Sequence, residues 1–431
     1  MVVNHRLKEL REGAKGKMLN VNKQRIEQKL FALGEIGRNA NGGMDRTTFT
    51  PAEMEARNWL MQELHSLNLA VHVDEAANIW GRKEGTNPEL PVLTFGSHID
   101  SVPNGGIYDG ALGVILALEV MRVLEENNVK TMHPLELVSF SAEEPNPFGF
   151  STFGSRAITG KLTAEDIIGV ADTDGRLLTE ALQDAGGNPN DFASAVRNPH
   201  EFAAYLEVHI EQGKRLLQRD IPVGVVTGIT GIYREEVTVR GDANHAGTTL
   251  MKDRVDAFLA AASMALALEE ILRNYPDEEV VGTIGQVFVK PNATNIVPGE
   301  VTFSLELRGQ TKEKIQDVLA KWEEKVQIMH RHRKVELKRI VKLDQAPVPM
   351  SEKIVACCEE QAANLSYPSY RLGSMAGHDA AHMASVTQAG MLFVPSLAGK
   401  SHCPEEESRM EDIEKVGNVL LHSILALDNS H

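Results

Sequence analysis

The chain has 431 residues, of which 42% are hydrophobic and 24% charged, which predicts an ordinary globular protein of two or three domains. Its formal net charge is −16, which argues against nucleic acid or an anionic membrane as partner, because both require a basic surface. A small anionic substrate is still compatible with this charge, since it needs only a local arginine.

The cysteines and the start of the chain indicate the cellular compartment. The three cysteines, Cys357, Cys358 and Cys403, are odd in number and two are adjacent, so no disulfide framework is expected and a reducing cytoplasm fits. Cys403 directly follows His402, but a histidine one position earlier is poorly placed to act as its base. The chain opens without a signal-peptide core, and no stretch reaches the length of a membrane span. We therefore expect a cytoplasmic protein.

The first half of the chain predicts an α/β domain. Residues 1–20 are polar and basic and are expected to form a loose tail. Thr50-Pro51-Ala52-Glu53 is a capping box with proline at the first helical position. The expected elements, in order, are helices at 22–36 and 50–67, strands at 71–81 and 90–95, a helix at 111–126, and strands at 135–141 and 203–210. Buried strands that alternate with helices predict a mainly parallel sheet.

A second, smaller domain begins near residue 227. Its expected elements are strands at 233–241, 280–290, 300–308 and 335–343, with helices at 255–275 and 311–333. The order β-α-β-β-α-β is that of a ferredoxin-like α+β domain. Helices at 351–364, 379–386 and 410–427 and a strand at 391–395 then return to the first domain. The prediction is a catalytic domain of residues 1–226 and 345–431 with residues 227–344 inserted.

The glycine-rich loop 96–110 is the centre of the predicted site. It follows a buried strand and carries His98, Asp100 and Asp109, at a place where open α/β sheets put their chemistry. His98 and Asp100 are two residues apart and face the same way in an extended chain, so Asp100 can orient the imidazole. The alternatives are a hydrogen-bonded loop pair and, for Asp109, the N-cap of the following helix.

Other strand ends carry similar side chains. Glu143 and Glu144 directly follow a buried strand. The functional interpretation is that one is a metal ligand and the other a general base, and the alternative is a solvated turn. His209 lies on an apolar strand, where a core histidine is the alternative, and His402 lies in a loop. Imidazole and carboxylate side chains at four strand ends of one predicted sheet favour binding of Zn²⁺, Mn²⁺, Co²⁺ or Ni²⁺. A bridging carboxylate could hold two ions about 3.5–4 Å apart around a shared water.

The inserted domain also carries polar residues suited to binding. His245 lies in Asn-His-Ala-Gly-Thr-Thr, Asn295 ends Asn-Ala-Thr-Asn between two strands, and Arg308 ends a strand. A guanidinium suits a bidentate clamp on a carboxylate. The alternative for Arg308 is an ordinary surface charge.

Together, these segments resemble the dinuclear metal amidohydrolases of the hydantoinase/carbamoylase group. That group includes N-carbamoyl-L-amino-acid hydrolases, β-ureidopropionases and allantoate amidohydrolases, and it is related to aminoacylases and metallo-exopeptidases. The resemblance runs from about Gly42 to the last helix. It rests on the motifs Gly-Ser-His-Ile-Asp-Ser-Val, Asn-Gly-Gly-Ile-Tyr-Asp-Gly, Glu-Glu-Pro-Asn-Pro-Phe-Gly, His-Ile-Glu-Gln-Gly, Asn-His-Ala-Gly-Thr-Thr, Asn-Ile-Val-Pro-Gly, Ala-Gly-His-Asp-Ala and Ser-His-Cys-Pro-Glu-Glu.

The resemblance implies a role for each candidate residue. Two divalent ions per subunit would be held by two ligand sets that share one aspartate: His98, Asp109 and His209, and Asp109, Glu144 and His402. The catalytic residues would be Glu143 as general base toward the bridging water, Asp100 as support for His98, and His245 at the oxyanion, often from the partner subunit. The substrate would be bound by Gln212, Asn295, Arg308, Gly377 and Gly399, with Arg308 on its carboxylate.

The implied activity is hydrolysis of the ureido C–N bond of N-carbamoyl-L-amino acids by a homodimer, with the inserted domain as lid and dimerisation domain. His209 with Gln212 favours the carbamoylase and allantoate branch, because peptidase and deacylase relatives usually have a carboxylate at the position of His209. Ser374-Met375-Ala376-Gly377 departs from the Ser-Gly-Ala-Gly of many relatives and leaves the substrate open. The alternatives are an allantoate or ureidoglycolate amidohydrolase, a hydrolase of N-acyl amino acids or dipeptides, and a non-enzymatic metal-binding protein on this fold.

Overall fold

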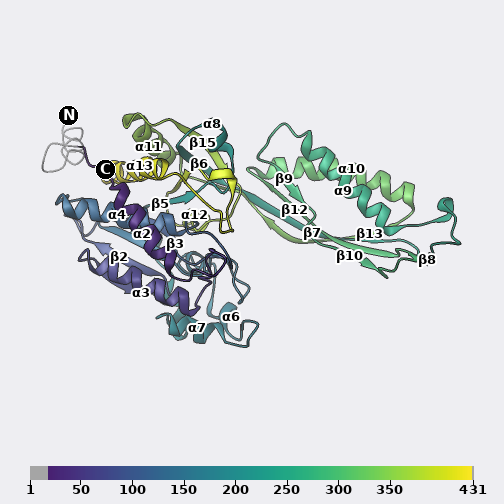
Figure 1. Ribbon diagram of the computed structural model, residues 1–431, viewed down its shortest axis with the longest axis horizontal. Helices are drawn as coiled ribbons and strands as arrows, with labels where there is room; N and C mark the ends of the chain where they lie inside the picture. The colour runs from purple at the N-terminus through teal and green to yellow at the C-terminus, as the bar shows by residue number, and fades with distance from the viewer. Residues whose placement is uncertain (1–17, 430–431) are drawn as a thin grey trace. The chain divides into compact units, whose positions relative to one another are not determined.

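The computed structural model describes residues 18–429, so most of the tail predicted over residues 1–20 lies outside the described residues. The chain divides into two compact units, coloured along the sequence in Figure 1. Within the described residues, the first unit consists of residues 18–227, Met350–Leu372 and residues 378–429. The second consists of Gly228–Pro349 and Gly373–Gly377, and is therefore an insertion in the sequence of the first.

The first unit is built on a nine-stranded sheet with the order β1-β2-β4-β3-β5-β16-β6-β14, in which β15 also pairs with β6. Its strands are β1 Ala70–Val73, β2 Ile79–Lys83, β3 Val92–His98, β4 Leu135–Phe140, β5 Phe202–Ile210, β6 Val223–Ile229, β14 Val348–Pro349, β15 Ser369–Ser374 and β16 Ala389–Val394. The central strands β4, β3, β5 and β16 are parallel, as predicted, whereas β1, β2, β6 and β14 pair antiparallel. Every residue of β3 and β4 is buried, which explains their apolar sequences.

The segment 71–81, predicted as one strand, is a hairpin of β1 and β2. Asp74 makes the turn, because its Oδ1 accepts hydrogen bonds from the backbone N–H groups of Ala76 and Asn78 at 3.0 and 2.8 Å. Ala77 adopts a left-handed φ of 64° within it. Aspartate favours such turns by bonding its own backbone, a signal that the alternating pattern of the segment concealed.

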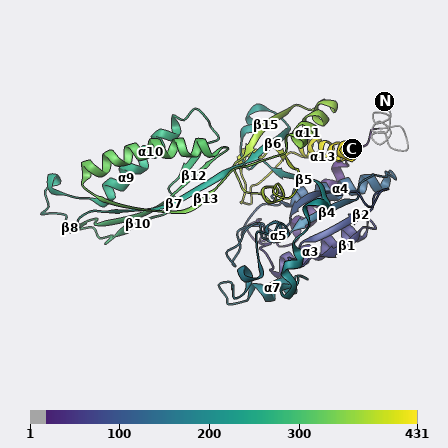
Figure 2. The same cartoon turned by 180° about the vertical axis from the view of Figure 1, so that it is seen from behind.

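The first unit also contains helices, several of which pack against this sheet. The helices are α2 Lys23–Glu35, α3 Pro51–His65, α4 Ala111–Glu126, α5 Phe153–Ile158, α6 Ala164–Ile167, α7 Leu178–Asp184, α8 Arg215–Arg219, α11 Glu352–Asn364, α12 Ala380–Met383 and α13 Met410–Asp428. Helices α2, α4 and α13 pack on one another. Helix α3 packs on β1 and β2, beside which it lies in Figure 2. Over residues 18–429, no helix has both the length and the apolar character needed to cross a bilayer.

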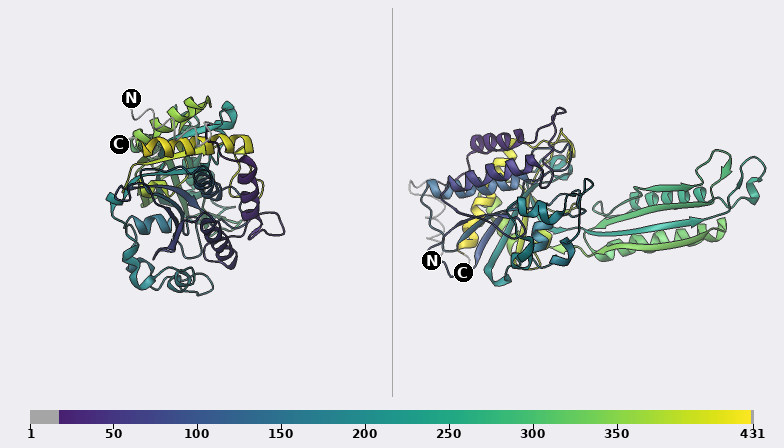
Figure 3. Two further views of the ribbon diagram at one scale, coloured as in Figure 1. Left: turned by 90° about the vertical axis from the view of Figure 1, so that its left-hand side faces the viewer. Right: turned by 90° about the horizontal axis from the view of Figure 1, so that it is seen from below.

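The second unit has the predicted order β-α-β-β-α-β. Its elements are β7 Gly231–Arg240, β8 Asn244–His245, α9 Ala257–Arg273, β9 Val281–Thr283, β10 Val287–Lys290, β11 Ile296–Val297, β12 Glu300–Gly309, α10 Lys312–Arg333 and β13 Glu336–Gln345. The long antiparallel strands, visible in Figure 3, follow the order β10-β12-β7-β13. The strand predicted at 280–290 is divided into β9 and β10, which both pair with β12. Trp322 and Phe303 are buried in the core between the helices and the sheet.

Candidate metal centre

The five side chains that the resemblance assigned to metal binding meet at the carboxyl ends of the parallel strands. His98 is the last residue of β3, and His209 lies one residue before the end of β5. Glu144 follows β4, Asp109 precedes α4 and His402 lies beyond β16. His98 was expected in the loop after a strand ending at residue 95, but β3 continues through it. The strand therefore fixes the position of this imidazole.

These side chains form two groups that share Asp109. In each group the three ligand atoms lie within 4.8 Å of one another. In the first group, Asp109 Oδ1 is 3.0 Å from His209 Nε2 and 3.6 Å from His98 Nε2. In the second group, His402 Nε2 is 3.4 Å from Asp109 Oδ2 and 3.3 Å from Glu144 Oε1. Asp109 thus presents one carboxylate oxygen to each group.

The residues fit a pair of divalent ions. His98 Nε2 and Glu144 Oε1 are buried, and neither has a hydrogen-bond partner among the described residues. Buried polar atoms are normally paired, so one unpaired ligand atom in each group points to a missing partner in each. Imidazole and carboxylate donors are those that Zn²⁺ and its neighbours in the first transition series accept.

Backbone carbonyls orient the two strand-borne histidines. His98 Nδ1 lies 3.1 Å from the carbonyl oxygen of Asp100, and His209 Nδ1 lies 3.0 Å from that of Ile210. A carbonyl only accepts, so each Nδ1 carries the hydrogen and each Nε2 keeps its lone pair. His98 Nε2 has no hydrogen-bond partner among the described residues, whereas His209 Nε2 accepts the N–H of Gly110 at 3.2 Å. Gly110 gives the first ring its space: its φ is 62°, and a Cβ there would lie 2.2 Å from the His98 ring.

Asp100 supports both halves of the site. Its Oδ1 lies 3.4 Å from His98 Nδ1 and accepts the backbone N–H of Glu143 at 3.2 Å. Its Oδ2 accepts the N–H of Glu144 at 3.1 Å and the hydroxyl of Thr48 at 2.9 Å. Asp100 therefore holds the ring on β3 and the glutamate pair after β4 in one arrangement.

The buried carboxylates make the site strongly electronegative. Burial raises the pKa of Glu143 well above its usual range, and the adjacent Glu144 raises it further. Burial also raises the pKa of Glu144 to about 7, with Asp109 adding to the effect. Asp109 differs, because the neighbouring histidines hold its pKa well below the usual range in spite of burial. The hydrogen bond to Asp109 raises the pKa of His402 to about 9. Such a cluster favours cations at its centre.

Glu143 lies beside both groups and belongs to neither. Its Oε2 is 3.7 Å from His98 Nε2, and its backbone carbonyl accepts the N–H of Thr152 at 2.7 Å. A carboxylate next to the ligand atoms that is not itself one of them is suitably placed to accept a proton from a water held there.

Two residues of the first unit were predicted to bind substrate. Gln212 contacts the metal centre directly, and Gly399 lies three positions before His402 in the sequence. Gln212 Nε2 donates to Asp109 Oδ2 at 2.7 Å, while its Oε1 has no hydrogen-bond partner in the described part of the chain. A Cβ added to Gly399 would lie 3.1 Å from the backbone of Gly213, so this glycine lets two loops approach closely. Gln212 therefore has a free acceptor beside the shared carboxylate.

The remaining predicted residues belong to the second unit. His245 and Asn295 line a groove of about 880 Å³, and the N–H of Ala246 donates to the carbonyl of Asn295 at 2.9 Å. Arg308 Nε donates to Glu306 at 2.7 Å and its Nη1 to the carbonyl of Met375 at 2.9 Å. Gly377 lies in the same unit. Their roles toward the metal centre stay predictions.

Three residues of the site were not singled out from the sequence; Glu207 and Glu406 are buried, and Ser401 is half-buried. Ser401 donates to Asp109 Oδ2 at 2.7 Å. The carboxylate of Glu406 accepts the backbone N–H groups of Asp109 and His402. Ser401 and Glu406 belong to Ser-His-Cys-Pro-Glu-Glu, in which only the histidine had been given a role. Glu207 lies two residues before His209 and accepts the hydroxyl of Ser97 at 2.8 Å. A glutamate in an otherwise apolar strand was its only signal.

Comparisons with known proteins show which proteins the chain is similar to. A family model described as Peptidase family M20/M25/M40 matches residues 94–426. The chain is 39% identical to an N-carbamoyl-L-amino acid amidohydrolase of Geobacillus stearothermophilus over 404 residues, covering 94% of this chain and 98% of the relative. It is 35% identical to an allantoate amidohydrolase of Bacillus subtilis, covering 91% and 94%. A crystal structure of a hydantoinase/carbamoylase family amidase from Burkholderia multivorans aligns with a TM-score of 0.89 at 31% identity, covering 96% and 99%.

Proposed function

Because the chain belongs to peptidase family M20/M25/M40, we propose that it is a metal-dependent amidohydrolase that cleaves the ureido C–N bond of N-carbamoyl-L-amino acids. The observation that carries the proposal is the pair of ligand groups sharing Asp109, in which every member except His402 is buried. The similarity to an N-carbamoyl-L-amino acid amidohydrolase over nearly the whole chain supports the choice of substrate.

The ligand sets would be those of the two groups, His98 with His209 and Glu144 with His402, joined by Asp109. Two bound divalent ions would lower the pKa of a water between them and polarise the substrate carbonyl. Zn²⁺, Mn²⁺, Co²⁺ and Ni²⁺ all suit these donors.

Glu143 would accept a proton from the attacking water and deliver it to the leaving nitrogen. Asp100 keeps the Glu143 backbone in place through the hydrogen bond of 3.2 Å. His245 would donate to the developing oxyanion, and Arg308 would bind the substrate carboxylate. An N-carbamoyl amino acid would yield the amino acid, carbon dioxide and ammonia. In this account the inserted unit acts as a lid over the substrate, and the enzyme works in the cytoplasm.

A related ureido substrate is the second candidate. The chain is 35% identical to an allantoate amidohydrolase, and ureidoglycolate carries the same chemical group beside a carboxylate. The position of Met375 is compatible with this alternative. Its carbonyl accepts a hydrogen bond from Arg308, and its sulfur lies 3.4 Å from Gln310 Nε2. A residue whose backbone contacts the proposed carboxylate clamp would restrict what the substrate carries next to that carboxylate.

A substrate panel tests the proposal. We expect the highest kcat/KM for N-carbamoyl-L-amino acids, with lower values for allantoate, ureidoglycolate, N-carbamoyl-β-alanine, N-acyl amino acids and dipeptides. Ammonia release and amine release should occur in equal amounts. Efficient turnover of allantoate or of dipeptides, with none of any N-carbamoyl-L-amino acid, would contradict it.

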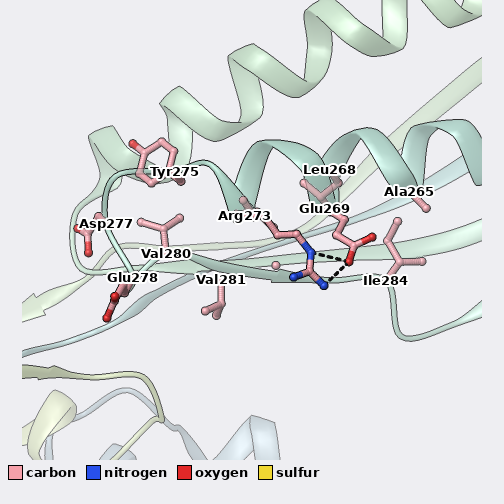
Figure 4. Close-up of a pocket in the computed structure, with 12 residues that line it drawn as sticks. Ala265, Leu268, Glu269, Arg273, Tyr275, Asp277, Glu278, Val280, Val281 and Ile284 are labelled. Carbon is pink, nitrogen blue, oxygen red and sulfur yellow. Dashed lines mark hydrogen bonds and ion pairs between the residues drawn. The ribbon is translucent and has the colours of Figure 1, made fainter. Parts of the chain in front are cut away.

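We also propose that the chain forms a homodimer through one edge of the inserted unit. β10 is an edge strand, and its Phe288 has 61% of its surface exposed. Leu266 of α9 is 65% exposed. Figure 4 shows a pocket of about 480 Å³ beside α9, lined in part by Leu268 and Val281. An exposed edge strand with apolar neighbours is a surface that a second copy can cover.

Replacing Phe288 with glutamate is expected to shift the protein from dimer to the 47.3 kDa monomer, because a charge would then enter the apolar contact. Light scattering coupled to size exclusion measures the mass. The matched control is Val341→Glu, which lies on β13 at the other edge of the sheet and is 56% exposed. A wild-type chain that is monomeric would rule out this interface.

A further inference from the structure

Glu406 joins the two loops that carry Asp109 and His402. Its carboxylate is buried, with 4% of the residue exposed. Oε1 accepts the backbone N–H groups of Tyr108 and Asp109, each at 2.9 Å. Oε2 accepts the N–H of His402 at 3.3 Å and lies 3.0 Å from the hydroxyl of Ser401, whose single hydrogen is shared between it and Asp109 Oδ2. Both oxygens are thus occupied by donors, so Glu406 fixes ligands rather than serving as one.

The loop before α4 leaves room for this carboxylate. A Cβ added to Gly106 would lie 2.2 Å from Glu406 Oε1, so any other residue there would displace the glutamate. The donors to Glu406 come from parts of the chain almost 300 residues apart, and the bond between Asp109 and Glu406 spans 297 positions. The glutamate therefore sets the distance between two loops that no local structure connects.

The two ligand groups differ in how firmly the chain holds them. His98 and His209 lie on central strands, and backbone carbonyls orient both rings. His402 lies in a loop with a left-handed φ of 58°, and 46% of its side chain is exposed. The position of His402 therefore depends more on the hydrogen bond from its backbone N–H to Glu406 than the positions of His98 and His209 depend on any single bond.

We propose that Glu406 is the positioning residue of the second ion, the one assigned to Asp109, Glu144 and His402. The inference rests on the proposed metal-dependent function. Glutamine in place of Glu406 has only one accepting oxygen. The better arrangement keeps that oxygen on the N–H groups of Tyr108 and Asp109 and turns the amide toward Ser401, whose hydroxyl can accept. The N–H of His402 then loses its acceptor, and only the second group contains His402.

The test is calorimetric titration of the metal-free, full-length chain with Co²⁺. Wild type should take up two ions per chain. In Glu406→Gln, one ion should bind with near wild-type affinity, and the other should bind about 10–100-fold more weakly, as for other groups that orient ligands. Excess Co²⁺ should restore kcat. The matched control is Glu405→Gln in the same loop, whose partner is the exposed Lys400, and it should behave as wild type.

Further variants keep the outcome decisive. If Glu406→Gln does not fold, Glu406→Asp replaces it, because a shorter carboxylate that keeps the N–H groups of Tyr108 and Asp109 cannot also reach the N–H of His402, and it should weaken the same single ion. In a His402→Ala background, adding Glu406→Gln should leave the affinity of the remaining ion unchanged. Equal weakening of both ions, or two unchanged affinities, would overturn the role of Glu406 while leaving the proposed function intact. A wild-type chain that takes up no ion would instead overturn the proposed function.

Discussion

Replacing Glu143 with glutamine is expected to lower kcat for an N-carbamoyl-L-amino acid by roughly 10²–10⁴-fold, the usual range for loss of a general base. Glutamine keeps the shape of the side chain but cannot accept a proton. Metal content should stay at the wild-type level, because Glu143 belongs to neither ligand group. Steady-state kinetics together with metal analysis by mass spectrometry measures both quantities.

The adjacent glutamate provides the comparison for this variant. Glu144 Oε1 lies 3.3 Å from His402 Nε2 and is buried without a hydrogen-bond partner among residues 18–429. Glu144→Gln should therefore lower metal content as well as turnover. The two variants would then differ: Glu143→Gln should lower kcat alone, whereas Glu144→Gln should lower both kcat and metal content. Wild-type kcat in Glu143→Gln would exclude it as the base.

Replacing Asp109 with asparagine is expected to weaken both ions, because this residue alone belongs to both groups. Asparagine has one accepting oxygen where the carboxylate presents two, and it removes the negative charge between the histidines. The loss of affinity should exceed about 100-fold, the upper range for residues that only orient ligands. Turnover should fall to background at metal concentrations that saturate wild type.

The control for Asp109→Asn is His402→Ala, which removes a ligand from one group only. It should retain one ion per chain, so the two variants separate a shared ligand from an unshared one. Metal titration of both variants gives the stoichiometry. Two ions retained by Asp109→Asn would show that this aspartate does not bridge the groups.

Residues fixed by local patterns were the easiest to predict from the sequence. His98 and His209 lie on buried strands and Glu144 lies shortly beyond one, so the strand-end rule of α/β sheets singled them out as candidates, and the family resemblance then implied their roles as ligands. The order of elements in the inserted unit was also legible, because its amphipathic helices and alternating strands keep their periods. The hairpin at Asp74 was missed, since a turn made by side-chain hydrogen bonds leaves the alternation of polarity nearly unchanged.

Contacts between distant segments could not be predicted. Nothing near Glu406 in the sequence indicates that it accepts the N–H of Asp109, 297 positions away. The same holds for Ser401, whose hydroxyl reaches Asp109 only after the sheet brings β3 and β16 to the same edge. Such bonds depend on which loops the fold places together, and no periodicity records that.

The most direct test of the account is reconstitution of the metal-free chain. Activity on an N-carbamoyl-L-amino acid is followed while Mn²⁺, Co²⁺, Ni²⁺ or Zn²⁺ is added in steps. The account predicts no turnover without metal and a maximum at two ions per chain. Full turnover by the chelated, metal-free protein would contradict it.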